Sequence, residues 1–426
     1  MTARMASRHS LAAWIWALVI IGILLRVFYT AITPYGTRAH DVGSHIDYIQ
    51  YVADHWSLPD PHAESEFYHP PLYYFLSAVL LHVETALGLN HDQALVGIQW
   101  FACLLSVITL LIVFWTGRLL FPDKKDEPSL LLYTAFVAVL PSFIFFAARI
   151  NNDVLYQVFA FLSVALAIAF WLKGKTMYWY LTSVALGLGL LSKGNVLLLV
   201  PLSWLLLMLH KKYSWTDKMM HLAASALILV ALAGWFYVPR YIQEHQSRVA
   251  LVGNVNILTN FVENTPAAYL TFNPVGMVMH PYNDPFDDAA RRQYFWEYLA
   301  RSALYGEFNF GVNDLLLARM MVASFLLILL LGAYSIWTDR KLWYRNLPVW
   351  SLLIFLLIGH AIFRYVFPYS SSQDFRYSIL LIIPIAYYMA RGWSEEQGTM
   401  QMTRTILPSY FVICCSVFLL SLASNG

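Results

Sequence analysis

Apolar runs of helical length recur in this sequence from residue 11 to residue 422. A hydrocarbon core about 30 Å thick needs about 20 apolar residues of α-helix to cross it. Only 12% of the residues are charged, about half the share of a soluble domain. Strands of a membrane β-barrel would instead alternate in polarity over about 10 residues. The sequence therefore predicts an all-α polytopic membrane protein.

About eleven transmembrane helices are predicted, and the positive-inside rule sets their direction. The predicted spans are 11–32, 94–117, 129–148, 153–172, 177–191, 195–210, 219–239, 315–337, 347–366, 377–390 and 405–422. With 71–88 lying at the interface, fifteen of the 27 basic residues fall in short inner segments. Counting 71–88 as a span would reverse this bias, so loop 33–92 is predicted to face outward.

Two interfacial helices are predicted in this first outer loop. Val42, Ile46, Ile49, Ala53 and Trp56 repeat at helical spacing and form one apolar face, which favours a helix lying on the membrane surface. The second interfacial helix is 71–88. The pair 177–191 and 195–210 is short for two spans and predicts a hairpin that turns near the outer face.

Three modules are predicted along the chain. Residues 1–240 form a transmembrane catalytic module, 241–314 an outer segment with an amphipathic helix at 287–305, and 315–426 the C-terminal spans. The N-terminal apolar run is too long for a cleaved signal and is expected to remain as the first span. Cys103, Cys414 and Cys415 lie in apolar spans and imply no disulfide framework. A formal charge of +2 gives no reason to expect nucleic acid.

Ionisable residues from distant parts of the sequence converge on the predicted outer face. Carboxylates and cations at one membrane depth suit a reaction at a lipid phosphate, with a carboxylate as general base and Lys or Arg on the phosphate. The candidates are Asp41, His45, His69, Arg149, Asp153, Lys193, Arg364, Asp374 and Arg376.

Structural alternatives accompany these candidates. Asp41 and Asp153 could each act as a helix N-cap, and Lys193 could snorkel from a helix end. Arg376 could pair locally with Asp374. Asp47, Asp54, Glu64 and Glu66 are interpreted as solvated side chains.

Over residues 1–240 the chain resembles the GT-C glycosyltransferases of the protein O-mannosyltransferase and aminoarabinose-transferase type. The resemblance lies in an ordered set of segments: a first span, HDVGSHIDYIQYV, HPPLYYFL, RINNDVLY and GLGLLSKGNVLLLVP. The later DFRYSILLIIP is similar to the lipid-donor side of related bacterial enzymes.

The resemblance implies inverting transfer of a sugar from a polyprenyl-phosphate carrier to a lipid, glycan or protein acceptor on the periplasmic face of a bacterial inner membrane. Asp41 matches the catalytic acidic residue, and Asp153 matches the second outer acidic residue, a metal or acceptor contact. Lys193, His69 and Arg376 would face the carrier phosphate.

One position departs from the resemblance. Relatives commonly have Asp-Glu where this chain has Asp41-Val42, which leaves divalent metal dependence open and raises His45 as a partner for Asp41. A transporter or flippase of a polyprenyl-linked substrate is the alternative function, and a non-catalytic membrane subunit is a third. The large first loop has no counterpart in the second half of the chain and favours the enzyme.

Overall fold

The computed structural model describes residues 2–64, 66–244, 261–311, 313–391, 393 and 398–423. The described residues fold into helices joined by short loops, and their one β-contact is an isolated bridge between Phe261 and Tyr369. The predicted all-α fold is confirmed.

The chain forms two compact units, each assembled from separate stretches of sequence. The first contains residues 1–28, 113–144 and 257–426, and the second contains residues 29–112 and 145–256. The predicted modules 1–240, 241–314 and 315–426 concern function and stay a prediction.

The first unit contains a group of packed helices and a set of shorter ones. α18 and α19 each contact α5 and α16 and also each other, and α17 packs on α18. The bounds are α1 Thr2–Ile32 (to residue 28), η1 Lys124–Asp126, α5 Glu127–Val139, α6 Pro141–Phe145 (to residue 144), α13 Pro266–Leu270, α14 Pro274–Met279, η5 Asp288–Ala290, α15 Phe295–Tyr305, α16 Leu315–Thr338, η6 Asp339–Leu342, α17 Leu347–Val366, η7 Ser370–Gln373, η8 Phe375–Leu381, α18 Ile382–Ala390 and α19 Thr399–Ser421.

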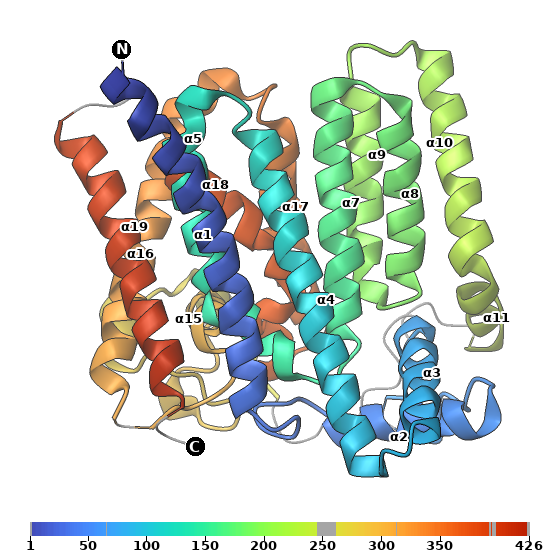
Figure 1. Ribbon diagram of the computed structural model, residues 1–426. Coiled ribbons are helices and arrows are strands. Elements are labelled where there is room, and N and C mark those ends of the chain that lie inside the picture. Colours follow the sequence, from blue (N-terminus) through green and yellow to red (C-terminus); the bar gives the residue numbers. More distant parts are fainter. Residues whose placement is uncertain are drawn as a thin grey trace. The chain divides into compact units, whose positions relative to one another are not determined.

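The second unit packs α7, α8, α9 and α10 side by side (Figure 1). α8 lies against α7, and α10 lies against α8. The bounds are α2 Val42–His55, α3 Leu72–Ala86, α4 His91–Leu120 (to residue 112), η2 Phe146–Ala148, α7 Asp153–Lys173, α8 Thr176–Leu190, η3 Gly194–Leu198, α9 Leu199–Leu209, α10 Trp215–Leu229, the π-helical η4 Val230–Gly234 and α11 Trp235–Glu244.

Close helix packing in the second unit depends on glycines in α8. A Cβ on Gly187 would lie 2.7 Å from Leu232, and one on Gly189 would lie 2.9 Å from Val196. Side chains at these two positions would hold the neighbouring segments away from α8. The GLGLL pattern before Lys193 is therefore explained by packing.

Seven helices of the described chain are long and apolar enough to cross a membrane, or eight if a bent pair is one span. The pair, 124–139 and 141–148, bends by 53° at Pro141, which cannot continue the hydrogen-bond ladder of a helix. The chain is a multi-pass integral membrane protein, but the predicted count of eleven is not confirmed. α8, α9 and α18 have only 15, 11 and 9 residues.

The predicted amphipathic helix over 287–305 begins later than expected. Asp287 caps a single 3₁₀ turn, and α15 begins at Phe295. Between them Arg291 adopts a left-handed conformation with φ 58°, which breaks the helix. Its guanidinium donates two hydrogen bonds of 2.6 Å to Glu297, which lies on α15.

Basic residues gather at one end of the α7–α10 bundle. Lys212 donates to the carbonyl of Gly174, and Tyr213 donates to the same carbonyl at 2.9 Å. The loop after α7, which carries Lys173 and Lys175, therefore adjoins the loop after α9. Both were predicted to lie on the inner side, and the structure places them at one end of the unit.

Candidate active site

The first outer loop folds into two helices that pack through aromatic rings. Tyr48 of α2 stacks on Tyr74 of α3 with ring centroids 3.7 Å apart, and His82 of α3 bonds the carbonyl of Ala53 at 2.8 Å. Both predicted helices of this loop are confirmed. Of the predicted apolar face of α2, only Ile49 and Ala53 are buried, because the face packed on α3 is the one that carries the stacked rings.

Asp41 precedes α2 in an unusual backbone conformation. Its φ and ψ are 54° and 28°, and its side chain makes no capping hydrogen bond, so the N-cap alternative fails for this carboxylate. The left-handed region is uncommon for residues other than glycine, although Asp tolerates it. The side chain is exposed. The backbone N–H of His45 donates to the carbonyl of Asp41, while the ring of His45 contacts other groups.

Lys193 and Asp153 form a buried ion pair. Nζ of Lys193 donates to Oδ1 of Asp153, and the two side chains are 10% and 3% exposed. The backbone N–H of Asp153 donates to Oδ1 of Asn151 at 2.7 Å, and the side-chain amide of Asn152 donates to the carbonyl of Ser192 at 3.1 Å. These bonds join the RINNDVLY segment to the Ser192-Lys193-Gly194 turn, so the two candidates Asp153 and Lys193 lie together.

Glu66, interpreted from the sequence as solvated, is buried against His69, so that interpretation was wrong. Its Oε2 lies 2.6 Å from Nε2 of His69, and the side chains are 12% and 10% exposed. Burial alone would raise the pKa of Glu66, but His69, His45 and Lys193 lower it to about 2. A hydrophilic loop residue thus joins the candidate site.

His45 contacts this pair through the ring of His69. Its ring stacks on His69 with centroids 5.8 Å apart, and its Nδ1 shares a 2.8 Å hydrogen bond with the Tyr74 hydroxyl. Burial lowers the pKa of His45 to about 4, with smaller effects from Glu66, His69, Asp153 and Lys193. The ring is therefore neutral near pH 7.

Two hydrogen bonds attach the loop to the bundle. The N–H of Leu72 donates to the carbonyl of Leu191 at 2.9 Å, and Arg240 of α11 donates to the carbonyl of Tyr68. Arg240 is 8% exposed and lies over the Phe236 ring at 4.1 Å. His69 is thereby fixed near Lys193, with the guanidinium of Arg240 held against the same loop.

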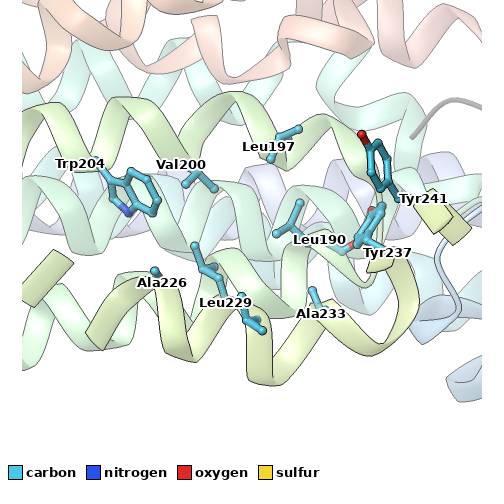
Figure 2. Close-up of a pocket in the computed structure, with 11 residues that line it drawn as sticks. Leu190, Leu197, Val200, Trp204, Ala226, Leu229, Ala233, Tyr237 and Tyr241 are labelled. Carbon is cyan, nitrogen blue, oxygen red and sulfur yellow. The ribbon is translucent and has the colours of Figure 1, made fainter. Parts of the chain in front are cut away.

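An apolar groove lies among α8, α9, α10 and α11 of the second unit. Its volume is about 370 Å³, and Figure 2 shows Tyr237 and Tyr241 together at one end and Trp204 at the other. Tyr237 donates to the carbonyl of Leu190 at 2.8 Å, two residues before Ser192. The groove is lined by Leu190, Leu197, Val200, Trp204, Ala226, Leu229, Val230, Ala233, Gly234, Tyr237 and Tyr241.

Arg149 is buried just before α7. It is 4% exposed, and its guanidinium carbon lies 4.6 Å from the centre of the Phe146 ring. The neighbouring carbonyl of Ala148 accepts a 3.1 Å bond from Gln99 of α4. Arg149 is thus fixed at the start of the RINNDVLY segment.

Three candidates, Arg364, Asp374 and Arg376, belong to the first unit. Arg364 is fully buried at the end of α17 and donates to Asn264, to the carbonyl of Glu263 at 2.8 Å and to the hydroxyl of Tyr269 at 3.3 Å. Its guanidinium therefore fastens the outer segment 263–269 to α17.

Asp374 and Arg376 lie at the start of η8. Oδ1 of Asp374 accepts from the backbone N–H of Arg376 at 2.8 Å, so this carboxylate caps the turn. The guanidinium of Arg376 lies 4.9 Å from the Tyr377 ring and donates to its hydroxyl at 3.1 Å. The two residues are linked through the backbone of Arg376, and the predicted pairing of their charged side chains stays a prediction.

Comparison with known proteins gives a family match and a fold. Residues 68–237, two fifths of the chain, match the model of the dolichyl-phosphate-mannose-protein mannosyltransferase family. The oligosaccharyltransferase of Archaeoglobus fulgidus in its apo form has a TM-score of 0.52 at 11% identity, over 97% of this chain and 55% of that one. The fold is therefore similar to that of this oligosaccharyltransferase.

Two further solved structures are similar. AglB of the same organism, in complex with an inhibitory peptide and a dolichol-phosphate, has a TM-score of 0.52 at 13% identity, with 97% and 55% coverage. ArnT from Cupriavidus metallidurans, bound to undecaprenyl phosphate, has a TM-score of 0.45 at 11% identity, with 97% and 78% coverage. No curated protein matches the chain. The chain spans a little over half the length of the oligosaccharyltransferase, and the resemblance predicted from the sequence is confirmed.

Sequence reasoning missed two charged residues that the structure brings to the site. Arg240 follows the predicted span 219–239 and was not named as a candidate, although a basic residue at the end of an apolar span, between Tyr237 and Tyr241, was a usable signal. Glu66 stands three residues before His69, a spacing that one turn brings together. The predicted residues His45, His69, Asp153 and Lys193 do lie together in the second unit.

Proposed function

We propose that this chain is a membrane glycosyltransferase that moves a sugar from a polyprenyl-phosphate carrier to an acceptor hydroxyl of a lipid, glycan or protein. The observation that carries the proposal is the buried ion pair of Lys193 with Asp153, three residues after Leu190, which lines an apolar groove. A cation at the end of a hydrocarbon-lined groove suits a lipid whose headgroup is a phosphate. The match to the mannosyltransferase family over residues 68–237 covers these same elements.

The cations supply the chemistry that a phosphate leaving group needs. Cleavage of the bond between the anomeric carbon and the phosphate oxygen leaves the electron pair on that oxygen. Lys193, His69 and Arg240 are positioned to stabilise this charge, and the buried setting strengthens their effect. Asp153 holds the ammonium of Lys193 in place when no phosphate is bound.

The groove accommodates the carrier chain in this proposal. Its lining is hydrocarbon apart from the rings of Tyr237, Tyr241 and Trp204, so an isoprenoid chain would leave no polar group unpaired there. The tyrosines lie at the end near Leu190 and therefore near the phosphate. AglB and ArnT were solved with dolichol-phosphate and undecaprenyl phosphate respectively, which is consistent with this class of lipid.

Asp41 is the proposed general base. Its exposed carboxylate would take the proton of the acceptor hydroxyl as the hydroxyl oxygen bonds to the anomeric carbon, on the side opposite to the departing phosphate. Attack from that side inverts the configuration. A strained backbone at a charged residue is typical of functional positions. The site would face the periplasm of a bacterial inner membrane, opposite to the basic end of the bundle.

The remaining candidates have supporting roles in the proposal. His45 and Arg149 would line the sugar-phosphate position, and Asp374 and Arg376 stay candidate substrate-binding residues of the first unit. Arg364 is already bonded to the outer segment 263–269, so its proposed contribution is to hold that segment.

The test is transfer of radiolabelled sugar from a panel of polyprenyl-phosphate sugars to membrane extracts by the purified chain, with and without a chelator. We expect transfer by the wild type, a loss of about 10²- to 10⁴-fold in Asp41→Asn, and a smaller loss in Arg376→Ala. Asp47→Asn, an exposed carboxylate on the same helix, is the control and should keep full activity. Carrier binding and movement across vesicles without any sugar transfer would support the transporter instead.

A further inference from the structure

The first unit exposes a group of large apolar side chains between the end of α13 and the end of α14. Leu270 and Val275 are 83% and 71% exposed, and Phe272 and Met279 are exposed as well. Single exposed apolar residues are ordinary, but apolar side chains gathered on one short stretch are typical of a binding surface. The segment 270–279 therefore calls for a partner that is itself apolar.

The backbone of the segment 270–279 is fastened to the helices behind it. The N–H of Asn273 donates to Oε1 of Glu297 on α15 at 2.8 Å. The guanidinium of Arg319 on α16 donates to the carbonyl of Met279 at 3.3 Å and 3.2 Å. Met277 is only 1% exposed. One face of α14 thus packs on the unit, while the exposed side chains are held on the other face.

The helix behind the segment 270–279 is a candidate membrane span. α14 packs against α16, and residues 315–342 are long and apolar enough to cross a membrane. Leu316 in the first turn of α16 is 70% exposed, and Leu327 further along is 52% exposed. The apolar surface of the segment therefore adjoins a helix whose own exposed side chains suit lipid.

Arg319 marks the depth of this contact. It lies four residues after Leu315, which is about 6 Å along the helix axis. Interfacial helices bury their apolar faces about 5–10 Å into the boundary between headgroups and acyl chains. Among the described residues, the hydrogen-bond partner of the Arg319 guanidinium is the carbonyl of Met279, and no carboxylate pairs with it. A lipid phosphate is a suitable counter-charge for a guanidinium at this depth.

We propose that the segment 270–279 is a membrane-contact surface that lies in the interface of the leaflet where α16 begins, with Leu270, Phe272 and Val275 against acyl chains. The occupant is bilayer lipid, because the surface adjoins a span and has a guanidinium at the level of the phosphates. This inference goes beyond the proposed function and does not depend on it, since it concerns the depth of a segment that takes no part in the proposed transfer.

The experiment measures the depth of a fluorophore on single introduced cysteines of the full chain, in vesicles of phosphatidylethanolamine and phosphatidylglycerol. The quenchers are lipids with a nitroxide near the headgroup or near the chain end, and aqueous iodide. The three native cysteines are buried, and the unsubstituted chain reports any label that they take up. The fluorophore on Val275→Cys should lose more fluorescence to the shallow nitroxide than to the deep one, and little to iodide.

Two control positions calibrate the depth. Leu327→Cys lies about 18 Å along α16 from Leu315 and should lose more fluorescence to the deep nitroxide. Ala289→Cys is exposed beside Asp287 and Asp288 and should be quenched by iodide and by neither lipid. Each variant is first compared with the wild type by melting temperature.

Three results would overturn the inference. Iodide quenching of Val275→Cys equal to that of Ala289→Cys would mean that the segment lies in water. Protection from iodide without quenching by either lipid would mean that a protein, such as a second copy of this chain, covers it. Stronger quenching by the deep nitroxide would place it inside the hydrocarbon core. Leu270→Cys, at the most exposed of the four positions, repeats the measurement if Val275→Cys does not fold.

Discussion

Replacing either partner of the ion pair between Lys193 and Asp153 should lower the free energy of unfolding, and replacing both partners should lower it little further. The side chains of Lys193 and Asp153 are 10% and 3% exposed. Asp153→Asn therefore leaves a buried ammonium without its carboxylate, and Lys193→Met leaves a buried carboxylate without its ammonium. Removal of one partner of a buried pair costs about 3–5 kcal/mol. If the costs were independent, the double variant would lose about 6–10 kcal/mol. We expect it to lose no more than one single variant does, because no unpaired charge remains.

The assay is a double-mutant cycle on the free energy of unfolding of the purified chain in mixed micelles. The predicted coupling energy is about 3 kcal/mol or more. The control is the ion pair of Arg292 and Asp288, whose carboxylate is 63% exposed and therefore solvated, and for which we expect about 1 kcal/mol or less. Additive losses for Asp153→Asn and Lys193→Met would refute the reasoning, since they would mean that water or other groups solvate each charge separately.

Three further predictions concern single residues. Asp41→Asn should lower the turnover number for sugar transfer while leaving the dissociation constant for undecaprenyl phosphate within about twofold, and a matching loss of lipid binding would contradict its role as base. Gly187→Val should cost about 1–3 kcal/mol in unfolding free energy, because its Cβ would lie 2.7 Å from Leu232. The control Gly36→Val should be neutral, because nothing lies within 4 Å of a Cβ there. Equal melting temperatures for the two variants would contradict the packing argument. The pKa of His45 is lowered from 6.5 to about 4, so between these values the unfolded chain binds more protons than the folded chain, and stability should fall as pH drops through that window. Thermal melts of His45→Gln should show a shallower fall of melting temperature with pH. An unchanged slope would refute the assignment.

The fold was predictable from hydrophobic pattern because spans are long and apolar. Helix breaks were harder to predict. Pro141 divides a predicted span, and Arg291 in a left-handed conformation delays α15 to Phe295. The bend at Pro141 is local in origin, and the break at Arg291 is accompanied by two hydrogen bonds from Arg291 to Glu297 that helical periodicity does not reveal. The count of eleven spans stays unconfirmed, because α8 and α9 are apolar but shorter than the about 20 residues that a span needs.

The candidate site was partly predictable because its residues are ionisable and lie beside apolar segments. Lys193 and Asp153 were both named from such positions, and their pairing across 40 residues of sequence follows from the packing of α8 on α7. Glu66 was missed because a loop carboxylate looks solvated unless its partner is known. Arg240 was missed because its contact, the carbonyl of Tyr68, lies 172 residues away.

The central claim is that the carrier chain lies in the groove and its phosphate lies at the Lys193 turn. The most direct measurement is photolabelling of the full chain with a polyprenyl phosphate that carries a diazirine in its isoprenoid chain, followed by mapping of the labelled peptides. We predict labels on the groove-lining segments that contain Leu197, Val200, Ala226 and Ala233, competed by undecaprenyl phosphate and weakened by Lys193→Met. Labels that spare these segments, or that Lys193→Met leaves unchanged, would contradict the account.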